Sequence, residues 1–249
     1  APFLFDNEKY AHDVTVAPFA IARAPVTNAE FAEFVAADGY ANDAYWCDVG
    51  KAWRNMRGID HPGYWVKNGR NRWRMRRFEH DIVLPENEPV IHVSWYEASA
   101  YCRWAGERLP TELEWEVAAL GTLAADGSLA VTKRRYPWGH TPPTPNCANL
   151  DARALGSIDV GALPDGDSAF GCRQMLGNVW EWTADTFQPF PDFAPDSYQE
   201  YSKGLFGNTK VLRGGAWTTR GRMMHGTYRN YFSPDRWNVF SGFRTCRAV

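Results

Sequence analysis

The C-terminal stretch, residues 211–249, holds the side chains best suited to chemistry. Arginines and aromatic rings alternate closely in it: Arg220, Arg222, His225, Tyr228, Arg229, Tyr231, Phe232, Arg236, Trp237 and Phe240. A guanidinium binds a carboxylate through two parallel hydrogen bonds, and flat rings attract a quaternary ammonium group. The run therefore indicates a pocket for a ligand that carries one of these groups. The alternative is that the rings only pack in the core and the arginines only face water.

Histidine and cysteine spacing gives no independent evidence for a metal site in this chain. No two of the six histidines lie at i, i+3 or i, i+4, the spacing that places two ligands on one helix face. The five cysteines are an odd number and form no C-x-x-C motif, which argues against a disulfide framework and against zinc. The Gly-Asp-Ser sequence at 166–168 lacks the glycine frame of a hydrolase nucleophile elbow.

Composition excludes several classes of partner. The net charge is −2, so no basic field is available to attract nucleic acid. No apolar run approaches the roughly 20 residues needed to cross a bilayer, and no signal-peptide pattern is present. We therefore expect a soluble, cytoplasmic protein without nucleic-acid or membrane partners. Its 249 residues suffice for one large domain or two small ones.

Three helices are predicted from capping boxes, in which a Ser or Thr and a Glu three residues later satisfy free backbone N–H groups. The boxes are Thr27–Glu30, Ser94–Glu97 and Thr111–Glu114. Glycines at 39, 106 and 121 mark the expected ends of these helices. The segments that could position a site are thus short and separate.

Strands are expected to be short and loops long. A partial alternation over residues 13–22 indicates a half-buried strand. Val211 and Leu212 indicate a buried strand that ends at Gly214-Gly215, where a positive φ or a close contact excludes a side chain. Residues 122–210 are rich in Gly, Pro, Asn and Asp and show few regular elements. Together these features predict a loop-rich α+β fold.

The segment 40–90 is long, polar and rich in tryptophan. A chain with 12 tryptophans is expected to have an irregular core or pockets for flat or cationic ligands. The basic residues from Arg70 to Arg77 are interpreted as a solvated surface, with a phosphate or partner contact as the alternative.

Motifs in a fixed order along the chain resemble the formylglycine-generating-enzyme family. They are V-T-N at 26–28, H-V-S-W-Y-E-A at 92–98, Y-C-R-W-A-G at 101–106, R-L-P-T-E-L-E-W-E at 108–116, L-G-N-V-W-E-W at 176–182, R-G-G-A-W at 213–217 and G-F-R at 242–244. Within this family the chain is most similar to the C-terminal domain of hercynine sulfoxide synthases of ergothioneine biosynthesis. The resemblance implies a single domain over residues 1–249 with a fold related to C-type lectins.

Two parts of the resembling proteins are missing from this sequence. Family members usually begin with a strand and a glycine-rich turn before the equivalent of Asp6-Asn7-Glu8. The sulfoxide synthases also carry an N-terminal helical domain with an H-x-x-x-H-x-E pattern, whose histidines bind iron. We therefore expect the Fe(II) ligands to lie outside this chain, in a longer parent or a separate partner chain. The sequence is either a natural short form or a fragment.

The resemblance also implies a substrate site. Residues matching Asn230, Tyr231 and Phe232 line the pocket where hercynine meets the thiol, and the residue matching Arg236 binds a substrate carboxylate. Further pocket candidates are Arg229, Phe190 and Phe193, although both phenylalanines could instead anchor a loop. The best-studied branch has an aspartate in place of Phe232 and a tyrosine in place of Phe190, which favours free cysteine over γ-glutamylcysteine as the thiol here.

Two other metals follow from the family. Formylglycine-generating enzymes bind copper through two cysteines after the R-G-G motif, but the matching residues here are Thr219 and Met224. We therefore do not expect a formylglycine-generating oxidase. Calcium is expected near Asn149, Asn178 and Glu181, because oxygen ligands from loops suit Ca²⁺. The alternative is that Asn178 only satisfies backbone groups in a turn.

The leading hypothesis is an iron- and O₂-dependent sulfoxide synthase that joins cysteine, or a cysteine-containing thiol, to hercynine. A rival hypothesis is a non-catalytic ligand-binding module of the same fold. A third is a variant synthase that makes an ovothiol-type product or a selenium analogue.

Overall fold

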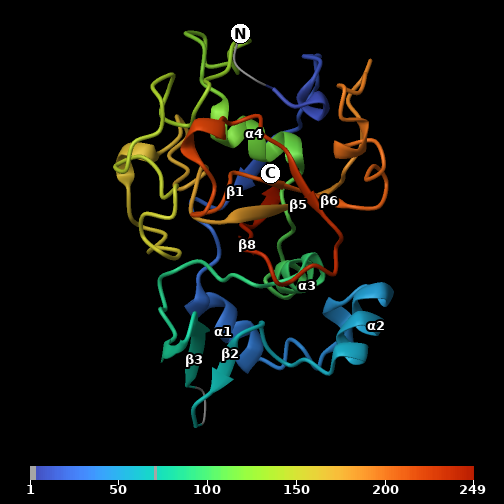
Figure 1. Ribbon diagram of the computed structural model, residues 1–249, viewed down its shortest axis with the longest axis vertical. Coiled ribbons are helices and arrows are strands. Elements are labelled where there is room, and N and C mark those ends of the chain that lie inside the picture. The colour runs from blue at the N-terminus through green and yellow to red at the C-terminus, as the bar shows by residue number, and fades with distance from the viewer. Residues whose placement is uncertain (1–3, 70–71) are drawn as a thin grey trace.

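The computed structural model describes residues 4–69 and 72–249. Helices and strands are short and long loops connect them (Figure 1). The α-helices are α1 (Asn28–Ala36), α2 (Asp48–Arg57), α3 (Trp95–Trp104) and α4 (Glu112–Leu120). The strands are β1 (Phe19–Ile21), β2 (Trp65–Lys67), β3 (Trp73–Arg77), β4 (His80–Val83), β5 (Trp180–Thr186), β6 (Lys210–Arg213), β7 (Asn230–Phe232), β8 (Ser241–Gly242) and β9 (Cys246–Ala248). Single 3-10 turns are η1 (Asp6–Glu8), η2 (Asp43–Tyr45), η3 (Pro164–Gly166), η4 (Gln199–Tyr201) and η5 (Gly221–Met223).

The three predicted helices are confirmed as α1, α3 and α4. Each begins with the predicted capping box: the hydroxyl oxygens of Thr27, Ser94 and Thr111 accept hydrogen bonds from backbone N–H groups three residues later. The glutamates at those positions accept from the backbone of the capping residues in return. No α-helix in the described part of the chain is long and apolar enough to span a membrane.

Helix α2 was missed, because its start carries an unusual signal. Its N-cap is Cys47, whose sulfur accepts from the N–H of Gly50, and its end is Gly58 with a φ of 60°. Only Gly50, Trp53 and Arg54 are buried along it. Its apolar stripe is thus too narrow to stand out in the sequence.

The central sheet has the strand order β7-β6-β5-β8. Strand β6 pairs antiparallel with β5 and with β7, whereas β8 runs parallel to β5. The predicted strand at Val211 and Leu212 is confirmed as part of β6. It ends at Gly214 and Gly215, whose φ angles are 94° and 83°. Strand β5 was not predicted, because its first four residues are all buried and show no alternation.

Two smaller sheets complete the fold. The predicted strand within residues 13–22 is confirmed only for β1, which pairs with the C-terminal strand β9. A hairpin sheet with the order β2-β3-β4 lies beside α1, and both lie below α3 in Figure 1. The basic residues from Arg70 to Arg77 were interpreted as a solvated surface, and strand β3 within this segment was not predicted. Arg77 in this strand forms an ion pair with Glu88, and Arg70 lies outside the described residues.

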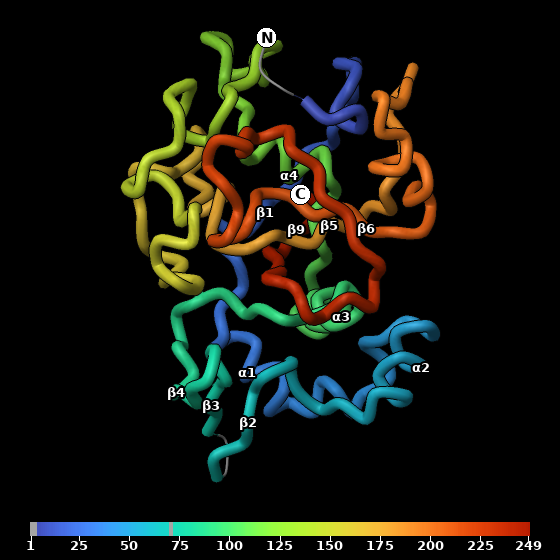
Figure 2. The backbone as a smooth tube through the Cα atoms, viewed as in Figure 1, coloured from blue at the N-terminus to red at the C-terminus, as the bar shows by residue number. Residues whose placement is uncertain are grey.

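Loops flank the central sheet, as predicted for residues 122–210 outside β5. In Figure 2 the green-to-yellow loops before β5 run on the left of the sheet and the orange loops after it run on the right. In the main core, the rings of Phe31 and Tyr101 stack on each other, and each of them also contacts the rings of Phe34 and Phe243. This core fixes α1 and α3 against the sheet that carries the C-terminal residues.

Candidate functional site

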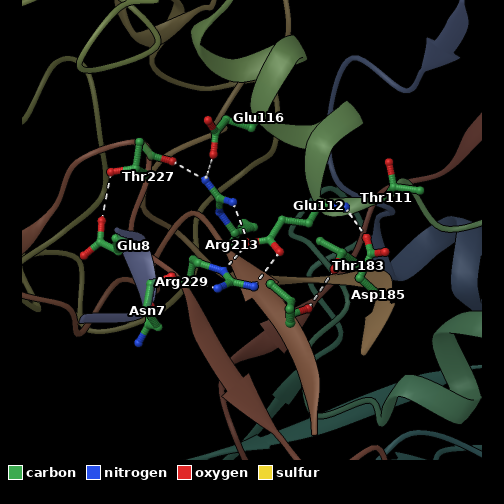
Figure 3. Close-up of polar contacts among 12 residues, drawn as sticks. Asn7, Glu8, Thr111, Glu112, Glu116, Thr183, Asp185, Arg213, Thr227 and Arg229 are labelled. Carbon is green, nitrogen blue, oxygen red and sulfur yellow. Dashed lines mark hydrogen bonds and ion pairs between the residues drawn. The ribbon is translucent and has the colours of Figure 1, made fainter. Parts of the chain in front are cut away.

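Two arginines of the C-terminal segment are buried against carboxylates of helix α4 (Figure 3). Arg213 donates to Glu112 at 2.8 Å and to Glu116 at 2.7 Å. Arg229 donates to both oxygens of Glu112, at 2.7 and 2.9 Å. The exposed fractions of Arg213 and Arg229 are 0% and 2%. The guanidinium groups therefore do bind carboxylates, but carboxylates of the same chain.

Arg229 has further partners that anchor two loops. It donates to the backbone oxygen of Asn7 at 2.7 Å and to that of Gln188 at 3.1 Å. Its guanidinium carbon lies 4.0 Å from the ring centre of Phe190. The guanidinium predicted to contact substrate is thus used inside the fold. The same contacts favour the loop-anchoring interpretation of Phe190.

Tyr231 belongs to the same packed layer. Its ring stacks on Phe187 with the ring centres 4.1 Å apart, and its hydroxyl donates to the backbone oxygen of Tyr201. Burial raises the pKa of Tyr231 to about 12. Phe193 reaches this layer through Phe206, whose ring centre lies 5.0 Å from it and 4.7 Å from that of Phe187. Tyr231 and Phe193 therefore pack within one aromatic cluster.

The opposite face of β7 carries the other predicted residues. Successive residues of a strand point to opposite faces, so Asn230 and Phe232 lie on the face away from Tyr231. Asn230 accepts a hydrogen bond from the Tyr231 backbone N–H at 2.9 Å. The guanidinium carbon of Arg236, an exposed residue, lies 5.8 Å from the ring centre of Phe232. The structure thus brings Asn230, Phe232 and Arg236 together and separates them from Arg229 and Tyr231. We call this set of three residues the β7 outer face.

Lys210 and Trp95 adjoin the β7 outer face, and sequence reasoning missed both. Lys210 is the cross-strand partner of Phe232, so the two side chains share a face. Its ammonium lies 4.2 Å from the ring centre of Trp95 and donates to the backbone oxygen of Ala184 at 2.9 Å. Burial lowers the pKa of Lys210. The signal that could have revealed Lys210 was the alternation of side chains along paired strands, because Lys210 lies opposite Phe232 and so shares its face.

Helix α3 positions the loop that carries Arg236. The backbone N–H of Trp95 donates to the oxygen of Pro234 at 3.0 Å, and its indole N–H donates to the oxygen of Thr183 at 2.8 Å. Trp95 therefore ties the start of α3 both to strand β5 and to the loop after β7. An exposed arginine, a half-buried lysine and aromatic rings then form a surface suited to an anionic molecule with a cationic group.

The residues predicted to bind calcium already have protein partners. The side-chain oxygen of Asn178 accepts from Asn149 at 3.0 Å and from the backbone N–H of Ile158 at 2.9 Å. Both oxygens of Glu181 accept from Arg244, at 2.6 and 2.8 Å. The arrangement matches the alternative in which Asn178 satisfies backbone groups. The side-chain oxygens of Asn178 and Glu181 are thus engaged by protein donors, and calcium at this place stays a prediction.

An iron or copper centre is not assembled from the described residues alone. Within residues 4–69 and 72–249, no group of three or more His, Cys, Asp or Glu side chains is arranged to hold a metal ion. At the two positions where the family's copper cysteines would stand, Thr219 accepts from the N–H of Ala216, and Met224 is buried.

Comparison with known proteins places the chain in a family. The family model described as the sulfatase-modifying factor enzyme 1-like domain matches residues 2–249. The chain belongs to this family. The resemblance inferred from the ordered motifs is thereby confirmed, and one family domain covers almost the whole chain.

Several relatives are similar over nearly the full chain. A protein named hercynine oxygenase from Mycobacterium tuberculosis is 44% identical over 98% of this chain and 56% of its own length. Another of that name from Mycolicibacterium thermoresistibile is 44% identical over 98% of this chain and 54% of its own length. The chain thus spans about half the length of these relatives. A formylglycine-generating enzyme from Streptomyces coelicolor is 34% identical, with coverages of 96% and 81%.

Solved structures show the same fold at low identity. PvdO from Pseudomonas aeruginosa superimposes with a TM-score of 0.61 and 22% identity, covering 98% of this chain and 86% of its own. CarF superimposes with a TM-score of 0.54 and 20% identity, covering 100% and 94%. The predicted loop-rich α+β fold of the formylglycine-generating-enzyme type is therefore confirmed.

Proposed function

We propose that this chain is the substrate-binding part of an iron- and O₂-dependent sulfoxide synthase that joins cysteine to hercynine in ergothioneine biosynthesis. The observation that carries the proposal is the 44% identity, over 98% of the chain, to proteins named hercynine oxygenase. The proposed location is the cytoplasm.

The proposed reaction balances without a further reductant. A C–H bond of the hercynine imidazole and the S–H bond of the thiol break, and a C–S bond forms. One atom of O₂ becomes the sulfoxide oxygen and the other leaves as water. Joining the two substrates supplies two electrons and oxidation of the sulfur supplies two more, which together reduce O₂ fully.

The β7 outer face and its neighbours are proposed to bind both substrates. Arg236 presents an exposed guanidinium to a substrate carboxylate, and charge-assisted pairs of this kind are typically about twice as strong as neutral hydrogen bonds. Lys210 supplies a second cation on the same face. The rings of Phe232 and Trp95 attract the trimethylammonium group of hercynine, an interaction worth about 0.5–2 kcal/mol.

The thiol is proposed to be free cysteine. Phe232 places an apolar ring on the face where Lys210 and Arg236 are both cationic. In γ-glutamylcysteine the cysteine nitrogen is an uncharged amide, and the γ-glutamyl arm adds a second carboxylate together with its own ammonium. The ring of Phe232 offers this polar arm no hydrogen-bond partner. γ-Glutamylcysteine is therefore expected to be the poorer substrate.

Iron is proposed to come from a helical domain with the H-x-x-x-H-x-E pattern, either in the same longer protein or in a partner chain. When bound, iron activates O₂. The residues of this chain orient the two substrates and hold their charged groups. The relatives named hercynine oxygenase are about twice as long as the matched region, which supports the need for a second part.

The test combines the protein with Fe²⁺, hercynine and each thiol, with and without the helical domain, and measures O₂ uptake and the product mass. Sulfoxide formation with cysteine in the presence of the helical domain supports the proposal. Binding of hercynine without turnover in every combination supports the non-catalytic alternative. This alternative has a parallel in a relative from Mus musculus, 34% identical to this chain, that is named inactive C-alpha-formylglycine-generating enzyme 2. Turnover of histidine or a selenium donor instead would support a variant synthase.

A further inference from the structure

One cavity shares no lining residue with the β7 outer face. It has a volume of about 310 Å³, and its lining includes Tyr64 before β2, His92 before α3, Trp217 after β6 and Phe240 before β8. None of Asn230, Phe232, Arg236 or Lys210 lines it. This volume is at the lower end of the range for small-molecule sites, about 300–1,000 Å³.

Aromatic rings form the walls of this cavity. The ring centre of Phe240 lies 4.9 Å from that of Trp217 and 5.5 Å from that of His92. Tyr64 meets His92 edge to face with the ring centres 4.7 Å apart. A flat ring entering the cavity can therefore make the edge and face contacts that aromatic pairs prefer.

Two buried polar atoms of the lining have no protein hydrogen-bond partner among the described residues. They are the indole Nε1 of Trp217 and the Nδ1 of His92. Trp217 is only 6% exposed. An unsatisfied buried donor or acceptor costs about 1–3 kcal/mol, so most buried polar atoms are paired. Two such atoms around one cavity indicate a molecule that bonds to both.

The backbone at His92 is also held in an uncommon conformation. Its φ is 62°, in the left-handed region that residues other than glycine rarely adopt. Strained conformations of this kind concentrate at binding sites, where the surrounding structure holds a side chain in a set direction. Here the ring is held between Tyr64 and Phe240.

The chemistry of His92 defines what the ligand must offer. Burial lowers the pKa of His92 to about 4, and a hydrogen bond to the backbone of Trp237 opposes this shift. The imidazole is therefore neutral near pH 7. Because this hydrogen bond raises the pKa, the ring is the donor and the backbone of Trp237 is the acceptor. A neutral imidazole has a single N–H, and this bond uses it. The unpaired Nδ1 therefore carries no hydrogen and can only accept. The ligand must donate to His92 and accept from the N–H of Trp217, and a hydroxyl group can do both.

The mouth of the cavity favours an anionic group. Arg76 lines it and is exposed, and its ion pair with Glu79 is long at 3.9 Å, with the Glu79 side chain 88% exposed. Arg77 and Ser157 also line the cavity, but both bond to Glu88. Of the two arginines that line the cavity, Arg76 has the weaker ion pair within the protein and is the one more available to a ligand anion.

We propose that this cavity binds a small phenolic acid, with its ring against the aromatic wall that Tyr64 and Phe240 help to form, its hydroxyl between Trp217 and His92, and its carboxylate toward Arg76. This site is separate from the proposed hercynine site and does not depend on the proposed reaction.

The test is isothermal titration calorimetry of the purified protein with 4-hydroxybenzoate and, as a matched control, 4-methylbenzoate. The methyl group fills the same space as the hydroxyl but cannot form hydrogen bonds. We expect 4-hydroxybenzoate to bind at least about tenfold more tightly, because the control leaves Trp217 and His92 unpaired. Equal affinities, or no heat with either compound at millimolar concentration, would overturn the proposal.

A variant and a structure provide independent checks. Trp217→Phe keeps an aromatic ring but removes the N–H together with the pyrrole ring that carries it, so it should weaken 4-hydroxybenzoate by about tenfold or more and should weaken 4-methylbenzoate less. A crystal structure grown with 4-hydroxybenzoate should show its hydroxyl against Trp217 and His92. Ordered water alone at those atoms would overturn the proposal. Hercynine and cysteine should not displace the compound, whereas displacement would place it at the substrate site instead.

Discussion

Substitution of Glu112 by glutamine should destabilise the protein strongly. The carboxylate of Glu112, 5% exposed, accepts three hydrogen bonds of 2.7–2.9 Å from the buried guanidinium groups of Arg213 and Arg229. With Glu116, two carboxylates balance two guanidinium groups, so the substitution leaves one buried positive charge without compensation. Removing one partner of a buried ion pair typically costs about 3–5 kcal/mol, and the loss for Glu112→Gln should fall in this range.

The assay is urea unfolding followed by tryptophan fluorescence, and the control is Glu79→Gln. Glu79 is 88% exposed and 3.9 Å from its partner Arg76, so its loss should cost under about 1 kcal/mol. Both variants replace glutamate by its neutral isostere, which isolates the effect of burial. If Glu112→Gln lowered the free energy of unfolding no more than the control does, the network of Figure 3 would not stabilise the fold as described.

Three further predictions follow from single contacts. Burial works to raise the pKa of Glu116, but the charges of Arg213 and Lys133 prevail and hold it at about 2, below the usual 4.5. The unfolded state therefore binds more protons between these values, so stability should fall by about 3 kcal/mol as pH drops from about 4.5 to 2. Glu116→Gln should flatten that part of the pH dependence, and an unchanged slope would refute the assignment. Gly242→Ala places a Cβ 2.4 Å from the oxygen of Val90 and should lower the melting temperature by several degrees, whereas Gly204→Ala meets no atom within 4 Å and should not. Tyr231→Phe loses the hydrogen bond to the Tyr201 backbone, so it should cost about 1 kcal/mol in urea unfolding without altering substrate affinity.

The helices and the end of β6 could be predicted because their signals are local. A capping box occupies four consecutive residues, and the pair Gly214-Gly215 permits a positive φ whatever surrounds it. Helix α2 lacked such a signal, since a cysteine caps it and few of its side chains are buried. Strand β5 lacked alternation because both of its faces are covered. In both cases tertiary burial, rather than local pattern, decided the structure.

The site was predicted as a group of residues but not as two faces. Asn230, Tyr231 and Phe232 are consecutive, and only the pairing of β7 with β6 shows that Tyr231 points away from the other two. The role of Arg229 could not be predicted from its sequence neighbours either, because its carboxylate partner Glu112 lies 117 residues earlier in the chain. A basic-aromatic run has the same appearance whether its carboxylate belongs to a ligand or to the protein.

The division of these residues between two faces also separates their expected effects. Substitutions in the Arg229 and Tyr231 layer should change stability. Substitutions on the β7 outer face should change substrate affinity with little effect on stability, because Arg236 is exposed.

The most direct test of the account is the Michaelis constant for cysteine of an Arg236→Ala variant, measured by O₂ uptake in the complete enzyme together with its melting temperature. Loss of a charge-assisted pair worth about 1.5–3 kcal/mol should raise that constant by about tenfold or more, with the melting temperature unchanged. A Michaelis constant equal to that of the unsubstituted enzyme would contradict the assignment of Arg236 and of the β7 outer face as the thiol-binding surface.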